Sequence, residues 1–321
     1  MSGARVRLGL IGAGRWGRAY IKSIALMPDA VLARVSSRNP QTSALVGPSC
    51  KVTDNWQALL RSGDLDGVIV ATPPGLHGRM TIEAIENNIP VLVEKPLTLN
   101  LAEARDVLKM AVSRQALVLT EHTYLFHPAY QILKERRQDF GRLKKIKTVS
   151  GNYGPFRKDA PPLWDWASHD IAVCLDFTGT RPLAIRAECQ DSQPTFEGPG
   201  QNFRLDIEFP EGILADIHIG NLMKLKQRRF EFIFDSQAAV IDDLSASKLT
   251  LNDWNDGHLK FRSALEVGRT PPLTKAIESF IQAIRSGSRD LFSLKMGVDV
   301  VAVLDACDSC LSRPGREWLP F

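Results

Sequence analysis

Six residues near the N-terminus restrict the fold of this chain more than any other feature. Gly12-Ala13-Gly14-Arg15-Trp16-Gly17 has the spacing GxGxxG, follows an apolar run and precedes a helical pattern. In a strand–turn–helix, such glycines allow a tight turn, a close approach of a pyrophosphate and close helix packing. The motif predicts a dinucleotide site that includes Gly12, Gly14, Arg15, Trp16 and Gly17. A glycine-rich turn without a ligand is the alternative interpretation.

The first 122 residues alternate short apolar runs with helical patterns. Such alternation is typical of a parallel sheet covered on both faces. We therefore predict an N-terminal Rossmann domain, a doubly wound α/β sheet that binds NAD(P), over residues 1–122. The expected strands are Val6–Ile11, Val31–Val35, Gly67–Ala71, Pro90–Glu94 and Leu117–Glu121. The expected helices are Trp16–Leu26, Trp56–Leu60, Leu76–Asn87 and Leu101–Val112, the last with Asn100 and Glu103 spaced as a capping box.

The pattern changes after residue 122, because several strand-like runs then follow one another. This order favours an α+β domain, a mainly antiparallel sheet flanked by helices, over residues 123–321. Its expected strands are Leu143–Tyr153, Ala184–Cys189, Phe203–Phe209, Leu214–Ile219 and Phe230–Phe234. Its expected helices are 128–138, 164–177, 273–285 and 292–312. We expect this domain to bind substrate and, since an open sheet face needs covering, to form a homodimer or homotetramer.

Composition narrows the possible partners. The chain has 321 residues, which favours about two domains, and a net charge of only +4, which gives no case for nucleic acid or a membrane surface. The apolar run Leu8–Ala13 is too short and too glycine-rich for a signal peptide, and no run approaches the roughly 18 to 20 residues of a membrane span. Five cysteines, an odd number, favour a reducing compartment. We therefore expect a cytoplasmic protein.

Two further patterns have ordinary structural explanations. Cys307 and Cys310 form a CxxC pair inside a helical pattern, and a zinc site would need two more ligands, so packing is the favoured interpretation and no metal is expected. The stretch from Lys134 to Lys147 holds seven basic residues against two acids. A solvated helix end and strand edge explains this charge, although a nucleotide-diphosphate substrate could also use it.

The end of the second expected strand bears on the choice of cofactor. An NAD-specific site usually has an acidic residue there for the ribose 2′-hydroxyl, but this strand ends in Ser36, Ser37 and Arg38. These side chains suit a 2′-phosphate, with Arg38 making a charge-assisted contact. We expect NADP as cofactor, with NAD as the possible alternative. A solvated loop arginine is the other interpretation of Arg38.

Combined in order, the motifs resemble those of the Gfo/Idh/MocA oxidoreductases, named for glucose–fructose oxidoreductase and inositol 2-dehydrogenase. After the glycine motif come Ala71-Thr72-Pro73-Pro74-Gly75-Leu76-His77, then Glu94-Lys95-Pro96, then a DxxxH pattern within Trp164–Asp170. The resemblance implies that Lys95, Asp165 and His169 surround the nicotinamide and the substrate carbon. It also implies a cis Lys95–Pro96 peptide, and cofactor contacts from Thr72, Pro73, Pro74, His77 and Glu94.

The resemblance further implies a substrate class. Tyr124–Ala129 and Asn152–Arg157 are similar to segments of members that act on activated or polymer-bound sugars. It implies substrate contacts from His127, Tyr153 and Arg157 beside the three catalytic candidates. His127 departs from the asparagine expected at its position. A sugar or sugar nucleotide is the expected substrate.

The chemistry of the residues agrees with this. Reducing a carbonyl by hydride transfer needs a proton at the oxygen, and Lys95 follows a strand at the edge where ligands bind. Asp165 and His169 are four residues apart, so a helix places them on one face, where His169 can move a proton. The structural alternatives are a solvated loop lysine, a helix-capping aspartate and a core histidine.

Two other functions fit the same fold. The first is a dinucleotide-sensing regulatory protein without catalysis, which would be expected to lack the lysine or the histidine. The second is a glycosidase that holds NAD tightly and oxidises its substrate transiently. We expect an NAD(P)-dependent dehydrogenase or ketoreductase that acts on CH–OH groups, because Lys95, Asp165 and His169 are all present.

Overall fold

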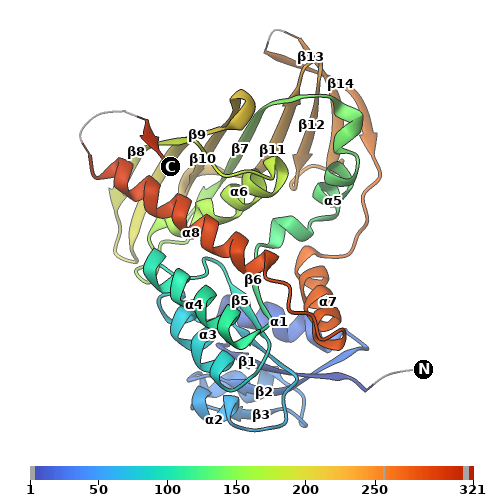
Figure 1. Ribbon diagram of the computed structural model, residues 1–321, viewed down its shortest axis with the longest axis vertical. Helices are drawn as coiled ribbons and strands as arrows, with labels where there is room; N and C mark the ends of the chain where they lie inside the picture. Colours follow the sequence, from blue (N-terminus) through green and yellow to red (C-terminus); the bar gives the residue numbers. More distant parts are fainter. Residues whose placement is uncertain (1–3, 256, 314–317) are drawn as a thin grey trace. The chain divides into compact units, whose positions relative to one another are not determined.

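A computed structural model of the chain describes residues 4–255, 257–313 and 318–321. The chain forms two compact units (Figure 1). Unit 1 comprises Met1–Thr123 and Pro271–Val301, and unit 2 comprises Tyr124–Thr270 and Ala302–Phe321. The chain therefore passes from unit 1 into unit 2, returns to unit 1, and ends in unit 2.

Unit 1 is built on a parallel sheet of six strands within the described residues, in the order β3-β2-β1-β4-β5-β6. The order reverses between β1 and β4, so their carboxyl ends flank the crevice in which such sheets bind ligands. The central strands are almost entirely buried and mainly apolar, as expected of a sheet covered on both faces. The strands are β1 Val6–Ile11, β2 Ala30–Ser36, β3 Lys51–Thr53, β4 Gly67–Val70, β5 Val91–Glu94 and β6 Val118–Glu121.

Helices cover both faces of this sheet (Figure 1). The helices α3 and α4 pack together on one side, and α1 and α7 contact each other on the other side. Asn100 begins α4 by accepting the Glu103 N–H, which confirms half of the expected capping box. The helices are α1 Arg15–Ala25, α2 Trp56–Leu60, α3 His77–Glu86, α4 Leu101–Arg114, α7 Pro272–Arg285 and the first half of α8 Phe292–Leu311.

Unit 2 is built on a mainly antiparallel sheet of nine strands within the described residues, in the order β14-β13-β12-β11-β7-β10-β9-β8-β15. Among the strands that the structure describes in this sheet, only β7 and β10 pair in parallel. A turn at Pro210–Gly212 joins β9 to β10, with Glu211 and Gly212 both at positive φ. The strands are β7 Leu143–Tyr153, β8 Ala184–Pro194, β9 Pro199–Phe209, β10 Ile213–Gly220, β11 Leu222–Phe234, β12 Gln237–Asp242, β13 Leu249–Asn255, β14 His258–Leu265 and β15 Leu319–Pro320.

One helix covers the centre of this sheet. Helix α6, Pro162–Thr178, packs on β7, β9 and β10. It begins with Pro162 in its first turn and ends at Gly179, which has the positive φ that favours glycine after a helix. A buried run from Ile171 to Phe177 fixes its position. Helix α5, Pro128–Glu135, and the second half of α8 complete the unit.

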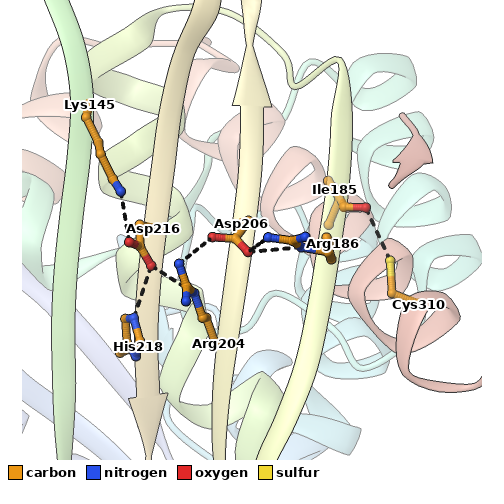
Figure 2. Close-up of polar contacts among 8 residues, drawn as sticks. All are labelled: Lys145, Ile185, Arg186, Arg204, Asp206, Asp216, His218 and Cys310. Carbon is orange, nitrogen blue, oxygen red and sulfur yellow. Dashed lines mark hydrogen bonds and ion pairs between the residues drawn. The ribbon is translucent and has the colours of Figure 1, made fainter. Parts of the chain in front are cut away.

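The other face of the sheet carries a row of alternating charges across four strands (Figure 2). Asp216 forms hydrogen bonds with Lys145 and His218 and an ion pair with Arg204. Asp206 accepts hydrogen bonds from Arg186 and forms an ion pair with Arg204. These contacts measure 2.6–3.3 Å. Both carboxylates are largely screened from solvent by their cationic neighbours. This face is therefore polar, in contrast to the face under α6.

The structure differs from the sequence-based division of the chain in one respect. Residues Pro271–Val301 were expected in the second domain, but they belong to unit 1. The reason is that α7 packs on the Rossmann sheet: Phe280 and Ile284 lie against Gly67 of β4. An amphipathic helix near the end of a chain can pack on either sheet, and periodicity alone does not say on which.

Candidate active site

The glycine motif forms a turn whose shape suits a dinucleotide. Gly12 has φ +99°, and a Cβ there would lie 2.5 Å from the Ala71 carbonyl oxygen. A Cβ on Gly17 would lie 2.0 Å from the Gly12 oxygen, so neither position accepts a larger residue. A Cβ on Gly14 would meet no atom within 4 Å, which leaves the space that a pyrophosphate requires. No side chain caps α1, so its first N–H groups can bind phosphate.

The loop after β2 is held by its own hydrogen bonds. The Ser36 carbonyl accepts the Gly12 N–H at 2.8 Å, so this loop is tied to the glycine turn. Ser37 Oγ accepts from the Asn39 N–H at 3.1 Å and from the Thr42 hydroxyl at 2.9 Å. Ser36 is buried and Arg38 is exposed. Ser37 retains its own hydroxyl hydrogen for a ligand, and the Arg38 guanidinium can reach an anion from solvent.

The segment after β4 is fixed to the segment after β5 by one histidine. His77 is 1% exposed, and its Nε2 lies 2.9 Å from the Thr72 carbonyl oxygen. Its Nδ1 lies 2.8 Å from the Pro96 carbonyl oxygen. His77 therefore joins the two loops, and of the two prolines in the loop after β4, Pro73 is exposed and Pro74 is buried.

Lys95 stands at the carboxyl end of β5 beside two buried acids. The Lys95–Pro96 peptide is cis, which confirms the expectation from the family resemblance. Glu94 and Glu121 are register partners on β5 and β6, and they are 4% and 1% exposed. Burial raises the pKa of Glu121 to about 8, and the charge of Glu94 adds to the rise. Burial also lowers the pKa of His122 to about 3, and the positive charge of Lys95 lowers it further.

Helix α6 presents the two catalytic candidates of unit 2. Asp165 and His169 are both half-buried and lie one turn apart. Asp165 does not cap the helix, since Pro161 occupies the N-cap. Asp165 instead pairs with Arg157 at 3.4 Å, and Arg157 also binds Asp159 through two bonds of 2.9 Å. Two residues expected at the substrate, Asp165 and Arg157, are therefore in contact.

Sequence reasoning missed the residues that surround His169. The Tyr124 ring lies 5.4 Å from the His169 ring, edge to face. The Arg228 guanidinium lies 4.6 Å from the Trp166 ring centre, and its charge acts on both Tyr124 and Asp170. Burial raises the pKa of Asp170 to about 6, against the effect of hydrogen bonds such as the one from Ser150 at 2.9 Å. Of these residues, Asp170 could have been found from the sequence, because it directly follows the DxxxH pattern.

His127, which we expect at the substrate, caps helix α5 and lies beside Asp243. Its Nδ1 accepts the Ala129 N–H at 3.2 Å, which caps α5, and its Nε2 lies 3.3 Å from Asp243 Oδ1. The residue is 6% exposed. Tyr153 is different, because it is 60% exposed and packs edge-on against Phe156. Tyr153 is thus accessible to a ligand and His127 is largely enclosed.

The basic stretch and the cysteine pair have local partners. Lys134 pairs with Asp176, Lys144 with Asp235 and Lys145 with Asp216, so acids from distant segments balance much of the charge. The stretch therefore gives no support for a nucleotide-diphosphate site. Cys307 is buried, and the Cys310 thiol contacts the Ile185 carbonyl (Figure 2). Within the described residues, no cluster of three or more His, Cys, Asp or Glu could bind a metal.

Comparison with known proteins identifies the family. Residues 6–122 match the family model GFO_IDH_MocA, described as an oxidoreductase family with an NAD-binding Rossmann fold. A crystal structure from Magnetospirillum magnetotacticum MS-1, provisionally named an oxidoreductase, is 38% identical, with a TM-score of 0.89 over 95% of this chain and 100% of that one. The chain belongs to the Gfo/Idh/MocA family. As a member of this family it is an NAD(P)-dependent dehydrogenase.

Named relatives of this Gfo/Idh/MocA protein act on sugars and inositols. UDP-N-acetylglucosamine 3-dehydrogenase of Acidithiobacillus ferrooxidans is 25% identical over 87% of this chain and 88% of its own length. Inositol 2-dehydrogenase of Rhizobium meliloti strain 1021 is 24% identical, covering 94% and 95%. The chain thus spans nearly the whole length of both relatives. Within the described residues, no helix combines the length and the apolar character needed to cross a membrane.

Proposed function

We propose that this protein transfers a hydride reversibly between NADP(H), with NAD(H) as the alternative, and a CH–OH or ketone carbon of a sugar or sugar derivative. The observation that carries the proposal is the glycine cradle of unit 1 together with Lys95, Asp165 and His169, which are all present. The cradle fits a dinucleotide because Gly14 is open where a pyrophosphate would lie. When bound, the nicotinamide donates or accepts the hydride.

The protein's own residues would supply the proton and the orientation. We assign Lys95 to give a proton to the substrate oxygen in reduction and to remove it in oxidation. His169 and Asp165 would bind and orient the reacting hydroxyl, and the Tyr124 ring limits the orientations open to His169. Arg157 holds the Asp165 carboxylate in one direction. Exposed Tyr153 is assigned to the sugar.

A sugar nucleotide is the more specific substrate proposal. It is supported by the relative that acts on UDP-N-acetylglucosamine, which is similar over most of both chains. An inositol or free sugar is the alternative, supported by the inositol 2-dehydrogenase relative. A cytoplasmic location and a homodimeric or homotetrameric state remain predictions.

A substrate screen tests this function. The purified protein would be incubated with sugars, inositols and sugar nucleotides, each with NADP and with NAD, and reduced nicotinamide would be followed by absorbance. We expect turnover with at least one substrate, lowered by about 10² or more in K95M and kept in K109M, which changes an exposed lysine on α4. Dinucleotide binding without any turnover would favour a regulatory protein. Glycoside cleavage without net cofactor consumption would favour a glycosidase.

A further inference from the structure

A pair of buried carboxyl groups lies behind the lysine to which we assign catalysis. Glu94 and Glu121 are register partners on adjacent parallel strands, and both are more than nine-tenths buried. Tyr20, a fully buried residue of α1, donates its hydroxyl to Glu94 Oε1 at 3.0 Å. Thr123 donates to Glu121 Oε2 at 2.6 Å, and Glu121 Oε1 has no hydrogen-bond partner within the described residues.

These contacts assign different charges to the two acids. Two carboxylates this close in a buried site cannot both ionise at low cost, so one of them keeps a proton at neutral pH. Glu94 accepts the tyrosine hydroxyl and is the better candidate for the charged form. Glu121, with one oxygen unpartnered, carries the proton.

We propose that Glu121 is a proton store for Lys95, holding the single proton of the Glu94–Glu121 pair at neutral pH and passing it to the lysine. This rests on the proposed role of Lys95. In reduction, the Lys95 ammonium gives one proton to the substrate oxygen and becomes an amine. The Glu121 carboxyl then gives its proton to that amine and becomes a carboxylate, which water reprotonates. In oxidation, the same proton moves in the opposite direction.

The surroundings of Glu121 agree with this transfer. Lys95 directly follows Glu94, the register partner of Glu121, and its positive charge acts on Glu121 as well as on His122. Burial keeps His122 neutral, which removes it as a competing cation. Tyr20 stays protonated, because burial and the two nearby glutamates raise its pKa well above the usual value. Helix α8 packs on Thr120 of β6 through Gly297. The acidic residue of α8 that is closest to Gly297 in the sequence is Asp299.

The presence of a proton on Glu121 can be tested without turnover. An acid whose pKa is raised on folding binds more protons in the folded state, so stability falls as the pH rises. For Glu121 this window runs from about 4.5, the ordinary glutamate value, to about 8. We expect E121Q to remove the slope of unfolding stability over this window, whereas E86Q, at an exposed glutamate of α3, keeps it. Infrared spectra at pH 7 should show a protonated carboxyl band that E121Q lacks. A wild-type slope and band in E121Q would overturn the proposal.

Kinetic measurements then test whether Glu121 passes its proton to Lys95. We expect E121Q to retain the first turnover but to slow repeated turnover at least about tenfold, with an altered pH–rate profile. An unchanged pH–rate profile would overturn the transfer step even if the stability slope is lost. Normal turnover in K95M would contradict the proposed function itself.

If E121Q does not fold, T123V provides the second test. This change removes a hydrogen bond that lowers the pKa of Glu121. It should move the upper end of the stability window to higher pH, and an unmoved window would overturn the proposal.

Discussion

The imidazole Nδ1 of His77 lies 2.8 Å from the carbonyl oxygen of Pro96, nineteen residues away in the sequence. The opposite nitrogen faces the Thr72 carbonyl at 2.9 Å. One buried ring thus joins the loop after β4 to the residue that follows Lys95. The ring donates a hydrogen bond to at least one of these carbonyls, because even a neutral imidazole carries one N–H.

Removal of this ring should destabilise unit 1. H77A removes the contacts of the ring with two buried carbonyl groups, at about 1–3 kcal/mol for each hydrogen bond lost. We expect the free energy of unfolding to fall by about 1–6 kcal/mol in urea titrations. The control is H258A at an exposed histidine of β14, which should change it by no more than about 0.5 kcal/mol. Equal stability of the two variants would contradict a joining role for His77.

The proposed acid–base groups give a kinetic prediction. K95M and H169A should each lower kcat by about 10² or more, because each removes proton transfer or orientation from the reacting oxygen. Dinucleotide affinity, measured by fluorescence titration, should stay close to that of the wild type. K109M and H258A serve as matched controls, since both residues are exposed. Near-normal turnover in K95M and H169A would show that neither residue carries the acid–base chemistry assigned to it.

Local sequence signals predicted much of the fold. The glycine spacing and the strand–helix alternation located β1, α1 and the parallel sheet, because each depends on residues close together in the chain. Strands β12, β13 and β14 were not predicted. Strand β14 is mostly exposed, so it lacks the clear alternation of buried and polar residues that marks a half-buried strand.

Long-range contacts account for what the sequence did not predict at the candidate site. Tyr20 and Glu94 are 74 residues apart in the chain and meet only because α1 packs beside β5. The capping role of His127 depends on a local turn and on Asp243, 116 residues further along. Motif spacing identifies which side chains carry chemistry, but their partners follow from the topology of the sheet.

Asp64 gives a prediction for acid conditions. Hydrogen bonds from Arg34, at 2.6 and 3.0 Å, hold the pKa of Asp64 well below its usual value. An acid whose pKa is lowered on folding adds stability above its unfolded value, here 3.8, and this stability is lost as the pH falls. We expect D64N to be less stable than the wild type at pH 7, and the difference to shrink below pH 3.8. D54N, at an exposed aspartate, should show no such change. Urea titrations across this range provide the measurement, and a difference that does not depend on pH would contradict the assignment.

Cofactor choice is the last prediction, and it depends on the loop after β2. No carboxylate ends this strand, whereas one there would bind the ribose hydroxyls of NAD and repel a 2′-phosphate. Ser37 has a hydroxyl hydrogen to donate, and exposed Arg38 supplies a positive charge. We expect NADPH to bind at least about tenfold more tightly than NADH, because one charge-assisted hydrogen bond contributes about 1.5–3 kcal/mol.

The variant R38A isolates that contribution. It should weaken NADPH binding by about tenfold and leave NADH binding almost unchanged. Tenfold corresponds to the lower end of the free-energy range for a charge-assisted hydrogen bond, which we expect because Arg38 is exposed. R105A removes an exposed arginine from α4 of the same unit and should alter neither affinity. Titration of the protein, freed of any cofactor, with both dinucleotides provides the measurement. Equal or tighter binding of NADH by the unmodified chain would show that Ser37 and Arg38 do not recognise a phosphate.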